Sequence, residues 1–273
     1  MFISASILSI LSGSKHMLYL GTSGYSYDDW VGPFYPRGLP KHDFLPHYTR
    51  FFNCVEVNYT HYAQPTQATM QGMVERTADD FRFAVKSFKD MTIGRSQDPV
   101  LYREYRYGIE PLVKSGKLGC VLLQFPNRFS LSKANVNHLA FIREQWPELP
   151  LVVEFRHASW IEDSRTFDFL RDKQMGFCCV DQPQLEGLLP PMVELTGSVA
   201  YVRFHGRNAE KWYKSDHAWE RYNYLYSEEE LSEWVPRVKD LQAKAEDVYV
   251  FFNNHYGANA VTNAQRFAEL LGN

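Results

Sequence analysis

The chain has little cysteine and no excess of positive charge. Its four cysteines, Cys54, Cys120, Cys178 and Cys179, lie inside apolar runs rather than at zinc-finger or disulfide-framework spacings, which favours a reduced, cytoplasmic protein. Lysine and arginine together number 29 against 32 aspartates and glutamates, which gives a net charge of −3. Electrostatic DNA or RNA binders usually show a basic excess, so a nucleic-acid partner is weakly supported, although local basic patches stay open.

The sequence also lacks an apolar run long enough to cross a bilayer. Residues 1–16 contain the short apolar stretch FISASILSILSG, without the positively charged start of a secretory signal. We interpret these residues as a leader or extension and predict one domain over residues 17–273, with no membrane partner. Met17 precedes the first expected strand, so we hypothesise an upstream choice of start codon; finding Met1 at the native amino terminus by mass spectrometry would reject it.

Familiar catalytic and nucleotide-binding motifs are missing as well. Neither GxGxxG nor GxxxxGK[ST] follows the first expected strand, so the sequence does not favour a nucleotide-binding doubly wound sheet. Ser23 lies in GTSGY rather than in the GxSxG of a serine hydrolase. No internal repeat, low-complexity tract or obvious linker divides the chain.

Eight apolar runs of strand length are present, at spacings typical of βαβ units. They cover residues 18–23, 54–58, 81–86, 119–124, 151–156, 176–181, 198–205 and 248–254. Helix-like segments separate several of them, at 65–79, 131–145, 164–174, 227–246 and 263–272. This alternation predicts an α/β fold, a single-domain (β/α)8 TIM-type barrel, with an open doubly wound sheet as the alternative.

Polar residues gather on one face of the expected strands. Because side chains alternate along a strand, Glu56 and Asn58 share a face, and so do Glu154 and Arg156. The same alternation places three polar residues on one face of the run 198–205: Tyr201, Arg203 and His205. Four other runs have a polar residue at or near their end: Lys86, Gln124, Asp181 and Asn253. Catalytic groups of this fold come from the carboxyl ends of the strands, so we predict a charged pocket there. The alternative is a polar plug of mutually neutralising ion pairs.

The candidate catalytic residues are Glu154, Lys86, His205, Asp181 and Glu56. Glu154 suits a general acid or base, with burial and nearby cations competing to set its pKa. Lys86 suits stabilisation of negative charge or, if burial lowers its pKa, the role of a base or Schiff-base amine. His205 offers proton transfer near neutral pH, although a lone histidine is more often a satisfied hydrogen-bonding residue.

The candidate substrate-binding residues are Ser23, Tyr25, Trp30, Asn58, Gln124, Arg156, Trp160, Arg203 and Asn253. The aromatic ones, together with Tyr27, suit stacking on a flat ligand, or else packing of the loops. Arg207 can join Arg156 and Arg203 in an anion cradle, unless the glycines nearby only permit turns. The longest expected insertion runs from 206 to 226 and is rich in aromatic residues.

No local ligand spacing announces a metal site, although some acidic and histidine side chains have suitable chemistry: Glu56, Glu154, Asp181, His205 and His255. We therefore predict no metal ligands and leave the cofactor unknown.

Seven segments taken together resemble one known family: LGTSGYSYDDWVGPFYP, FFNCVEVNYTHY, FRFAVKSFKDMT, LGCVLLQFPNRF, LVVEFRHASW, YVRFHGR and VYVFFNNHYGANAVTNAQRF. In this order they resemble the YecE-like proteins of the DUF72 family. The resemblance implies a TIM-type barrel in a bacterial-type cytoplasmic protein and supplies no reaction, because the family is defined by a domain of unknown function.

The family pattern coincides with many of the residues chosen above: Gly21, Ser23, Gly24, Trp30, Glu56, Asn58, Lys86, Gln124, Glu154, Arg156, Trp160, Arg203, His205, Gly206 and Asn253. One departure stands out. A Thr-His pair often follows the lysine strand in the family, whereas this chain has Thr92 and Ile93. The resemblance therefore does not establish that an activity depending on that histidine is retained.

Two functions follow as hypotheses. The first is an enzyme, with hydrolase as the favoured class, that applies acid–base chemistry to a small polar or anionic organic substrate. The second is a non-catalytic binding protein for a phosphorylated metabolite or single-stranded nucleic acid. A structural protein without chemistry is a third reading, and the sequence leaves the oligomeric state open.

Overall fold

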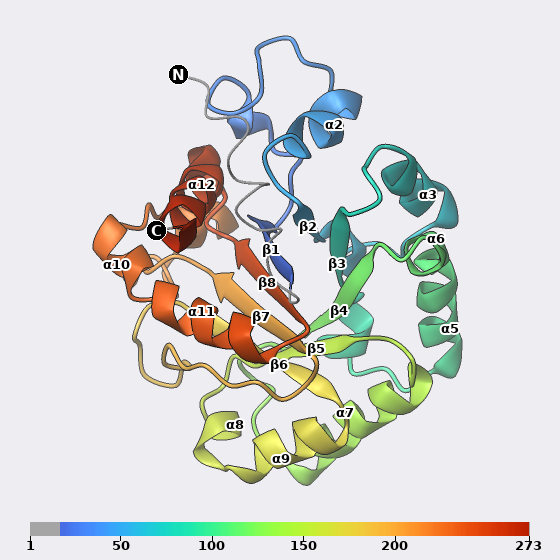
Figure 1. The fold of residues 1–273 in the computed structure, drawn as a ribbon. Helices are drawn as coiled ribbons and strands as arrows, with labels where there is room; N and C mark the ends of the chain where they lie inside the picture. Colours follow the sequence, from blue (N-terminus) through green and yellow to red (C-terminus); the bar gives the residue numbers. More distant parts are fainter. Residues whose placement is uncertain (1–16, 273) are drawn as a thin grey trace.

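The computed structural model describes residues 17–272, so the predicted leader at 1–16 lies outside the described residues. Eight parallel strands curve into a barrel surrounded by helices (Figure 1). The strands are β1 (Met17–Thr22), β2 (Cys54–Val57), β3 (Arg82–Lys86), β4 (Leu118–Gln124), β5 (Leu151–Glu154), β6 (Met175–Asp181), β7 (Val199–Phe204) and β8 (Asp247–Phe252). The prediction of a TIM-type barrel is confirmed, since every predicted run overlaps one strand.

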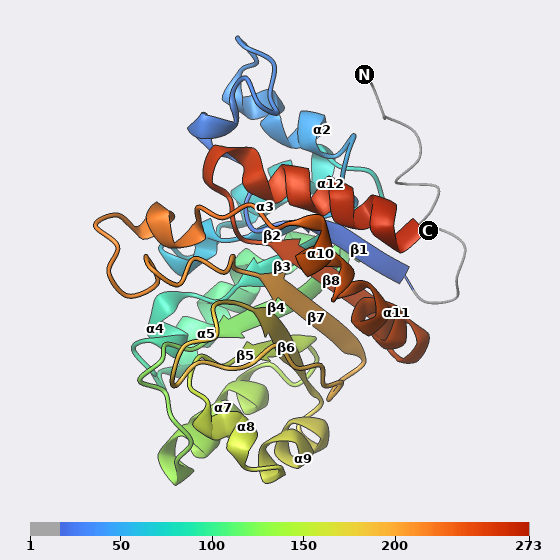
Figure 2. The same ribbon diagram turned by 90° about the vertical axis from the view of Figure 1, so that its left-hand side faces the viewer.

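Helices cover the outside of the barrel, as the side view shows (Figure 2). The α-helices are α2 (Phe44–Tyr48), α3 (Gln67–Glu75), α4 (Lys89–Thr92), α5 (Pro99–Gly108), α6 (Glu110–Lys114), α7 (Lys133–Gln145), α8 (Ser159–Glu162), α9 (Arg165–Asp172), α10 (Glu228–Ser232), α11 (Val235–Lys244) and α12 (Asn259–Gly272). Short 3-10 turns are η1 (Asp28–Trp30), η2 (Lys41–Asp43), η3 (Tyr59–His61), η4 (Ala218–Tyr222) and η5 (Tyr256–Ala258). Residues 182–198 join β6 to β7 without a helix, so one crossover departs from the regular repeat.

Side-chain caps begin several of the helices. The Thr66, Ser132 and Ser227 hydroxyls accept hydrogen bonds from backbone N–H groups in the first turns of α3, α7 and α10. These bonds satisfy N–H groups that have no partner inside the helix. Three of the helices predicted from capping and apolar period therefore begin near the expected residues.

The barrel closes between β1 and β2 through side chains as well as backbone. The Asn53 side-chain amide donates to Leu18 O and accepts from Leu20 N, both at 2.9 Å. Nearer the carboxyl end, the Tyr48 hydroxyl accepts from Thr22 N at 2.8 Å and donates to Cys54 O at 3.0 Å. These contacts occupy backbone groups at the seam that a strand ladder would otherwise pair.

A glycine permits the close approach of the two strands at this seam. A Cβ atom on Gly21 would lie 2.2 Å from Cys54 O, so a larger residue would push β1 and β2 apart. Beyond the seam, Gly24 N donates to Glu56 O at 2.8 Å and completes the ring at the carboxyl end of the strands. The local geometry therefore brings Glu56 of β2 next to the loop that follows β1.

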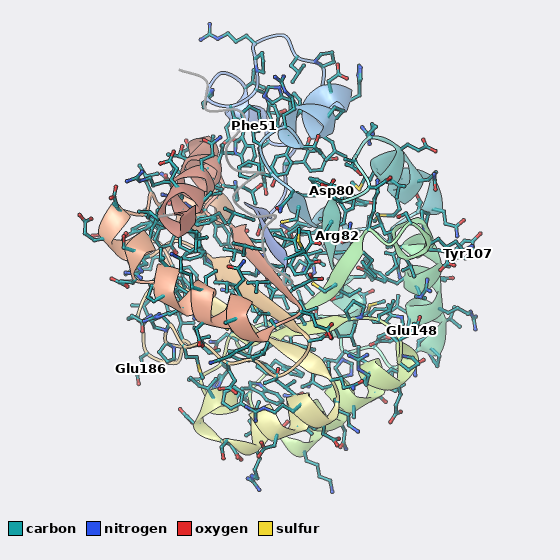
Figure 3. The ribbon with its side chains drawn as sticks, in the orientation of Figure 1. Phe51, Asp80, Arg82, Tyr107, Glu148 and Glu186 are labelled. Carbon is teal, nitrogen blue, oxygen red and sulfur yellow. The ribbon has the colours of Figure 1, made fainter. Side chains whose placement is uncertain are left out.

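Apolar and aromatic side chains fill the space inside and around the strands, while charged residues such as Glu148 and Glu186 lie at the periphery (Figure 3). All four cysteines are buried and free. Cys178 contacts Glu154 inside the barrel, whereas the Cys179 sulfur faces Glu194 O, so these neighbours point to opposite faces as the alternation predicts. Within residues 17–272, no helix has both the length and the apolar character needed to span a membrane.

Candidate functional site

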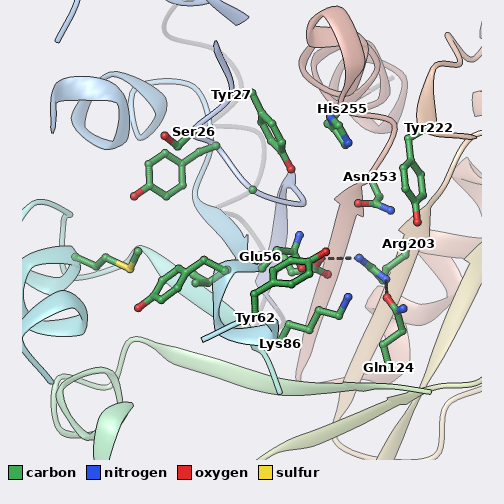
Figure 4. Close-up of a pocket in the computed structure, with 16 residues that line it drawn as sticks. Ser26, Tyr27, Glu56, Tyr62, Lys86, Gln124, Arg203, Tyr222, Asn253 and His255 are labelled. Atoms are coloured by element: carbon green, nitrogen blue, oxygen red, sulfur yellow. Dashed lines mark hydrogen bonds and ion pairs between the residues drawn. The ribbon is translucent and has the colours of Figure 1, made fainter. Parts of the chain in front are cut away.

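A cavity of about 460 Å³ opens at the carboxyl ends of the strands (Figure 4). Polar side chains from five strands or their ends form its floor: Glu56, Asn58, Lys86, Gln124, Arg203 and Asn253. The loops after β1, β2, β7 and β8 form most of its walls, with α3 adding one residue. The alternation along the strands thus brings these predicted residues into one cavity, at the end of the barrel where this fold places its chemistry.

Arg203 is the centre of the floor and is only 1% exposed. Its guanidinium donates to Glu56 Oε1 at 2.7 Å, to Glu154 Oε2 at 2.5 Å and to Gln124 Oε1 at 2.9 Å. The Tyr201 hydroxyl donates to the second Glu56 oxygen at 2.7 Å. Such a dense set of charge-assisted bonds holds the floor in one geometry.

Glu154 lies behind this floor and does not line the cavity. Its oxygens lie 2.5 Å from Arg156 Nε and 3.2 Å from His205 Nε2, in addition to the bond with Arg203. Burial alone would raise the pKa of Glu154, but the charges of Arg156 and Arg203 outweigh it and hold the pKa well below its usual range. The Arg156 guanidinium carbon also lies 5.8 Å from the centre of the Trp212 ring.

His205 is fully buried and neutral. Burial, with the nearby Arg156 charge, lowers its pKa to about 3. The Asn253 amide nitrogen lies 3.0 Å from Nδ1, so that ring nitrogen accepts and the proton sits on Nε2, facing Glu154. His205 therefore faces the Glu154 carboxylate. Because His205 does not line the cavity, it is not placed to donate a proton to a ligand there.

Lys86 differs from the other charged residues of the floor. Within residues 17–272 no ion pair or hydrogen bond engages its ammonium group, whereas Arg203 and Arg156 are both paired with carboxylates. Burial, followed by the charge of Arg203, lowers the pKa of Lys86 to about 8. Figure 4 shows its side chain extending into the cavity on the side of Gln124.

Aromatic rings form two walls above this floor. On one side Tyr27 stacks on His255 with ring centres 4.5 Å apart, and Tyr222 packs against the same histidine. Burial lowers the pKa of His255, so it is uncharged near neutral pH. The loop after β1, the end of β2 with the turn that follows it, and α3 supply further lining residues, which we call the apolar arm: Tyr25, Val57, Tyr59, Tyr62 and Met73. The cavity therefore joins a polar end at the barrel axis to a largely apolar arm.

Two expectations about charged residues are wrong. Asp181 points to the outer face of β6, where its carboxylate accepts from Tyr226, Trp234 and Arg207 at 2.7 to 2.9 Å. Asp181 and the inward Cys178 have opposite parity on β6, which puts them on opposite faces. Arg207 pairs with Asp181 on this outer face and also with Glu233 at 2.9 Å. It therefore does not join Arg156 and Arg203 in an anion cradle.

Four predicted binding residues lie outside the cavity lining: Ser23, Trp30, Arg156 and Trp160. The Trp30 indole donates to His255 O and the Trp160 indole donates to Phe129 O, both at 2.7 Å. Both rings are fully buried among other aromatic side chains, so the loop-packing alternative describes them better. Ser23 is also fully buried, with its hydroxyl 3.5 Å from Arg203.

Ile93, at the position of the family histidine, is 40% exposed at the end of α4 and does not line the cavity. Its neighbour Thr92 is buried. The position that departs from the family pattern is therefore not part of the cavity lining.

The side chains suggested as metal ligands do not form one ligand cluster. Among the residues that the structure describes, no three histidine, cysteine, aspartate or glutamate side chains are grouped to hold a metal ion. Glu56 and Glu154 are both engaged by Arg203, while Asp181 and His255 lie apart from them.

The sequence matches the family described as "Protein of unknown function DUF72" over residues 19–273. The chain belongs to the DUF72 family. A curated relative, the UPF0759 protein YunF of Bacillus subtilis, is 31% identical over 271 residues, which cover 93% of this chain and 95% of YunF. The UPF0759 protein YecE of Escherichia coli is 40% identical over 70 residues, 26% of this chain and 23% of YecE.

Solved DUF72 structures share the fold. A DUF72 family protein from Thermotoga maritima superposes with a TM-score of 0.87 and 40% identity, covering 94% of this chain and all of that one. One from Enterococcus faecalis gives a TM-score of 0.85 with 27% identity, covering 93% and 95%. None of these names states a reaction or a ligand, so function must be argued from the cavity.

Sequence reasoning missed part of the cavity wall. Ser26, Tyr59, Tyr62, Met73 and Tyr222 line the cavity although they were not selected as site residues. Tyr59 and Tyr62 follow Asn58 within four residues, so their position just beyond the end of β2 was the available signal. Met73 comes from within α3, and nothing in its helical pattern separates a cavity-lining methionine from a core methionine.

Proposed function

We propose that this DUF72 chain is an enzyme that acts on a small polar or anionic organic substrate, with the amine of Lys86 as its reacting group. The observation that carries the proposal is the isolation of this amine: it faces the cavity, while the other floor charges are engaged by one another. Fixed polar groups around a group with a strongly shifted pKa are typical of active sites.

The charges of the floor favour a substrate with little negative charge. Glu56 and Glu154 offset Arg203 and Arg156, so Lys86 supplies the remaining positive charge when it is protonated. One anionic or strongly polar oxygen suits this balance. A phosphorylated metabolite or a nucleic-acid strand brings more charge, and the arginines that would bind it are already paired, so the binding-protein alternative has weaker support.

Hydrolysis is the reaction class that the proposal favours, since the neutral amine of Lys86 can take a proton from an attacking water molecule. General bases work best when their pKa lies near the working pH, and a lysine with a pKa of about 8 meets this condition. Gln124 and Asn253 add polar groups that orient a substrate, while Tyr27 and Tyr222 offer flat surfaces for it. Glu154 then acts through Arg203 as a positioning residue.

The test combines ligand binding with turnover. A panel of small organic acids, esters, amides and carbonyl compounds is screened by thermal shift, and each stabilising compound is incubated with the protein and its products identified by mass spectrometry. The proposal expects turnover that Lys86→Met removes and that Lys89→Met, a change at an exposed lysine three residues away, preserves. Stabilisation without product in the wild-type protein, or turnover unchanged in Lys86→Met, would overturn it.

A further inference from the structure

We infer that the ε-amino group of Lys86 forms a Schiff base with an aldehyde or ketone whose carbonyl carries a flat, apolar group. The inference rests on the proposed function because it takes Lys86 as the reacting group. It names the substrate class, and for that class the amine acts as a nucleophile rather than as the base of a hydrolysis. The carbonyl end is placed at the barrel axis, and the flat end is placed in the arm lined by Tyr25, Tyr59 and Met73.

The backbone of Lys86 is held firmly while its side chain is left free. Its carbonyl oxygen accepts two hydrogen bonds, from the Thr60 hydroxyl at 2.5 Å and from the Tyr105 hydroxyl at 2.8 Å. The next residue, Ser87, continues the pairing with Leu122 O at 2.9 Å. These hydrogen bonds fix the backbone from which the Lys86 side chain extends. The position of the amine therefore depends only on the side-chain rotamer.

The amine is available as a nucleophile near neutral pH. With a pKa of about 8, about a quarter of the Lys86 side chains are neutral at pH 7.5, against about one in a thousand for an ordinary lysine. The cause is structural, since the side chain is largely enclosed, Arg203 lies close to it, and no carboxylate within the described part of the chain pairs with it. Lysines desolvated or placed beside another cation are activated in this way.

The chemical step balances without a further reactant. The Nζ lone pair forms a bond to the carbonyl carbon while the C=O π electrons move to oxygen, and one proton passes from nitrogen to that oxygen. The resulting carbinolamine takes a proton from solvent water on its hydroxyl and loses that group as water, which leaves an iminium cation. This cation carries the same charge as a protonated lysine, and the burial and the Arg203 charge that favour the neutral amine also favour loss of the iminium proton to give the neutral imine.

Two amides of the floor have free groups for such an intermediate. Asn58 Oδ1 is buried without a hydrogen-bond partner in the structure, although Asn58 lines the cavity. A buried acceptor without a partner calls for a donor, and the carbinolamine hydroxyl is one. Gln124 uses its oxygen to accept from Arg203, which leaves its NH₂ group to donate to the carbonyl oxygen.

The apolar arm selects what is attached to the carbonyl. Its lining includes three tyrosine rings and the Met73 side chain, which favour a flat or alkyl group over a sugar-like one. Tyr62 is 74% exposed at the rim and lies over the cavity in Figure 4. A small aromatic aldehyde therefore serves as a probe of both ends of the cavity, whereas a two-carbon aldehyde probes the amine alone.

The test traps the Schiff base by reduction. The wild-type protein is incubated at pH 7.5 with sodium cyanoborohydride and either benzaldehyde or acetaldehyde, and the rate of modification of each lysine is read by peptide mass spectrometry. With benzaldehyde, Lys86 is expected to be modified at least about tenfold faster than the exposed Lys89, with a rate that saturates as the probe binds first. With acetaldehyde the advantage of Lys86 over Lys89 is expected to be smaller and not to saturate.

Because the rates are read from the wild-type protein, the result does not depend on whether a variant folds. Lys86 modified no faster than Lys89, or a rate that rises linearly with benzaldehyde, overturns the inference. An equal preference for acetaldehyde overturns the assignment of the flat apolar group. The proposed function fails separately, through turnover that survives in Lys86→Met, so the two failures are distinguishable.

Discussion

Arg203 on β7 donates to Glu56 on β2 across the mouth of the barrel, with 2.7 Å between Nη2 and Oε1. This bond joins strands on opposite sides of the closing seam between β1 and β2. It also occupies the charge of Arg203, so the cavity presents Lys86 as its unpaired cation among the described residues. The predictions below follow from this arrangement.

Removal of Arg203 is expected to destabilise the fold severely. Arg203→Met leaves the buried carboxylates of Glu56 and Glu154 without their shared partner, and breaking a buried ion pair in this way costs about 3–5 kcal/mol. Arg203→Lys is expected to recover only part of the loss, because one ammonium group cannot reach both carboxylates as the planar guanidinium does. Urea unfolding measures the change in free energy.

A matched surface change serves as the control for this prediction. Arg165 also pairs with a carboxylate, Asp163, but its side chain is 87% exposed. Arg165→Met is therefore expected to leave the free energy of unfolding nearly unchanged. A similarly small change in Arg203→Met would show that the floor does not depend on this arginine.

Replacement of Lys86 is expected to stabilise the protein. Its pKa is about 8 in the folded chain and 10.5 in the unfolded chain, so folding opposes protonation at neutral pH. Lys86→Met is expected to gain up to about 3 kcal/mol at pH 7. Between pH 8 and 10.5 the unfolded wild-type chain binds the extra proton, so wild-type stability rises with pH and the advantage of the variant shrinks.

The measurement compares the two proteins by chemical denaturation at pH 7 and pH 10, where titrations common to both cancel. Lys89→Met is the control, since Lys89 is exposed, and is expected to show no pH-dependent gain. A loss of stability in Lys86→Met at pH 7 would mean that the ammonium group has a favourable partner in solution. Stabilisation on loss of a residue marks a position retained for a reason other than folding.

His205 is expected to remain neutral until strongly acidic pH. Its pKa is about 3 in the folded chain against 6.5 unfolded, so between these values the unfolded chain binds the extra proton and acidification destabilises the protein. Relative to His205→Gln, the wild-type protein is expected to lose about 2 kcal/mol of stability between pH 7 and pH 5. An NMR titration of the His205 ring with a midpoint near 6.5 would contradict this.

Asp181 is expected to anchor the loop at 206–226 rather than take part in chemistry. Asp181→Asn removes the charge that pairs with Arg207 and forces one amide group against the Trp234 and Tyr226 donors. We expect faster hydrogen exchange within residues 206–226 and a loss of about 2–3 kcal/mol in the free energy of unfolding. Unchanged exchange in this loop, which carries the cavity residue Tyr222, would remove the anchoring role.

The sequence predicted the barrel well because its strands have two signals at once. Each strand is an apolar run of suitable length, and the residue at or just after its end is often polar, as at Lys86 and Gln124. Glu56, predicted to share a face with Asn58, and Arg203, predicted to share one with His205, do lie at the mouth. Alternation alone was therefore enough to find the floor of the cavity.

The prediction failed for Asp181 because this residue has the parity of the outer face of β6, opposite to the inward Cys178. Asp181 ends an apolar run like its neighbours, yet it faces Trp234 and Tyr226 of the later loop and helix region. No local pattern reveals partners 45 or more residues away in the chain. The ion pairs of the floor could not be predicted either. The sequence does not show that Glu56 and Glu154 pair with arginines and leave Lys86 without a partner.

The most direct test of the account is the titration of Lys86 itself. The rate of acetylation of each lysine by acetic anhydride is measured across pH 6 to 11 by peptide mass spectrometry, with Lys89 as the internal reference. The account predicts that Lys86 reaches half of its maximal rate near pH 8. A Lys86 profile with a midpoint near pH 10.5, the ordinary value for a lysine, would contradict the claim that this cavity holds an unpaired, activated amine.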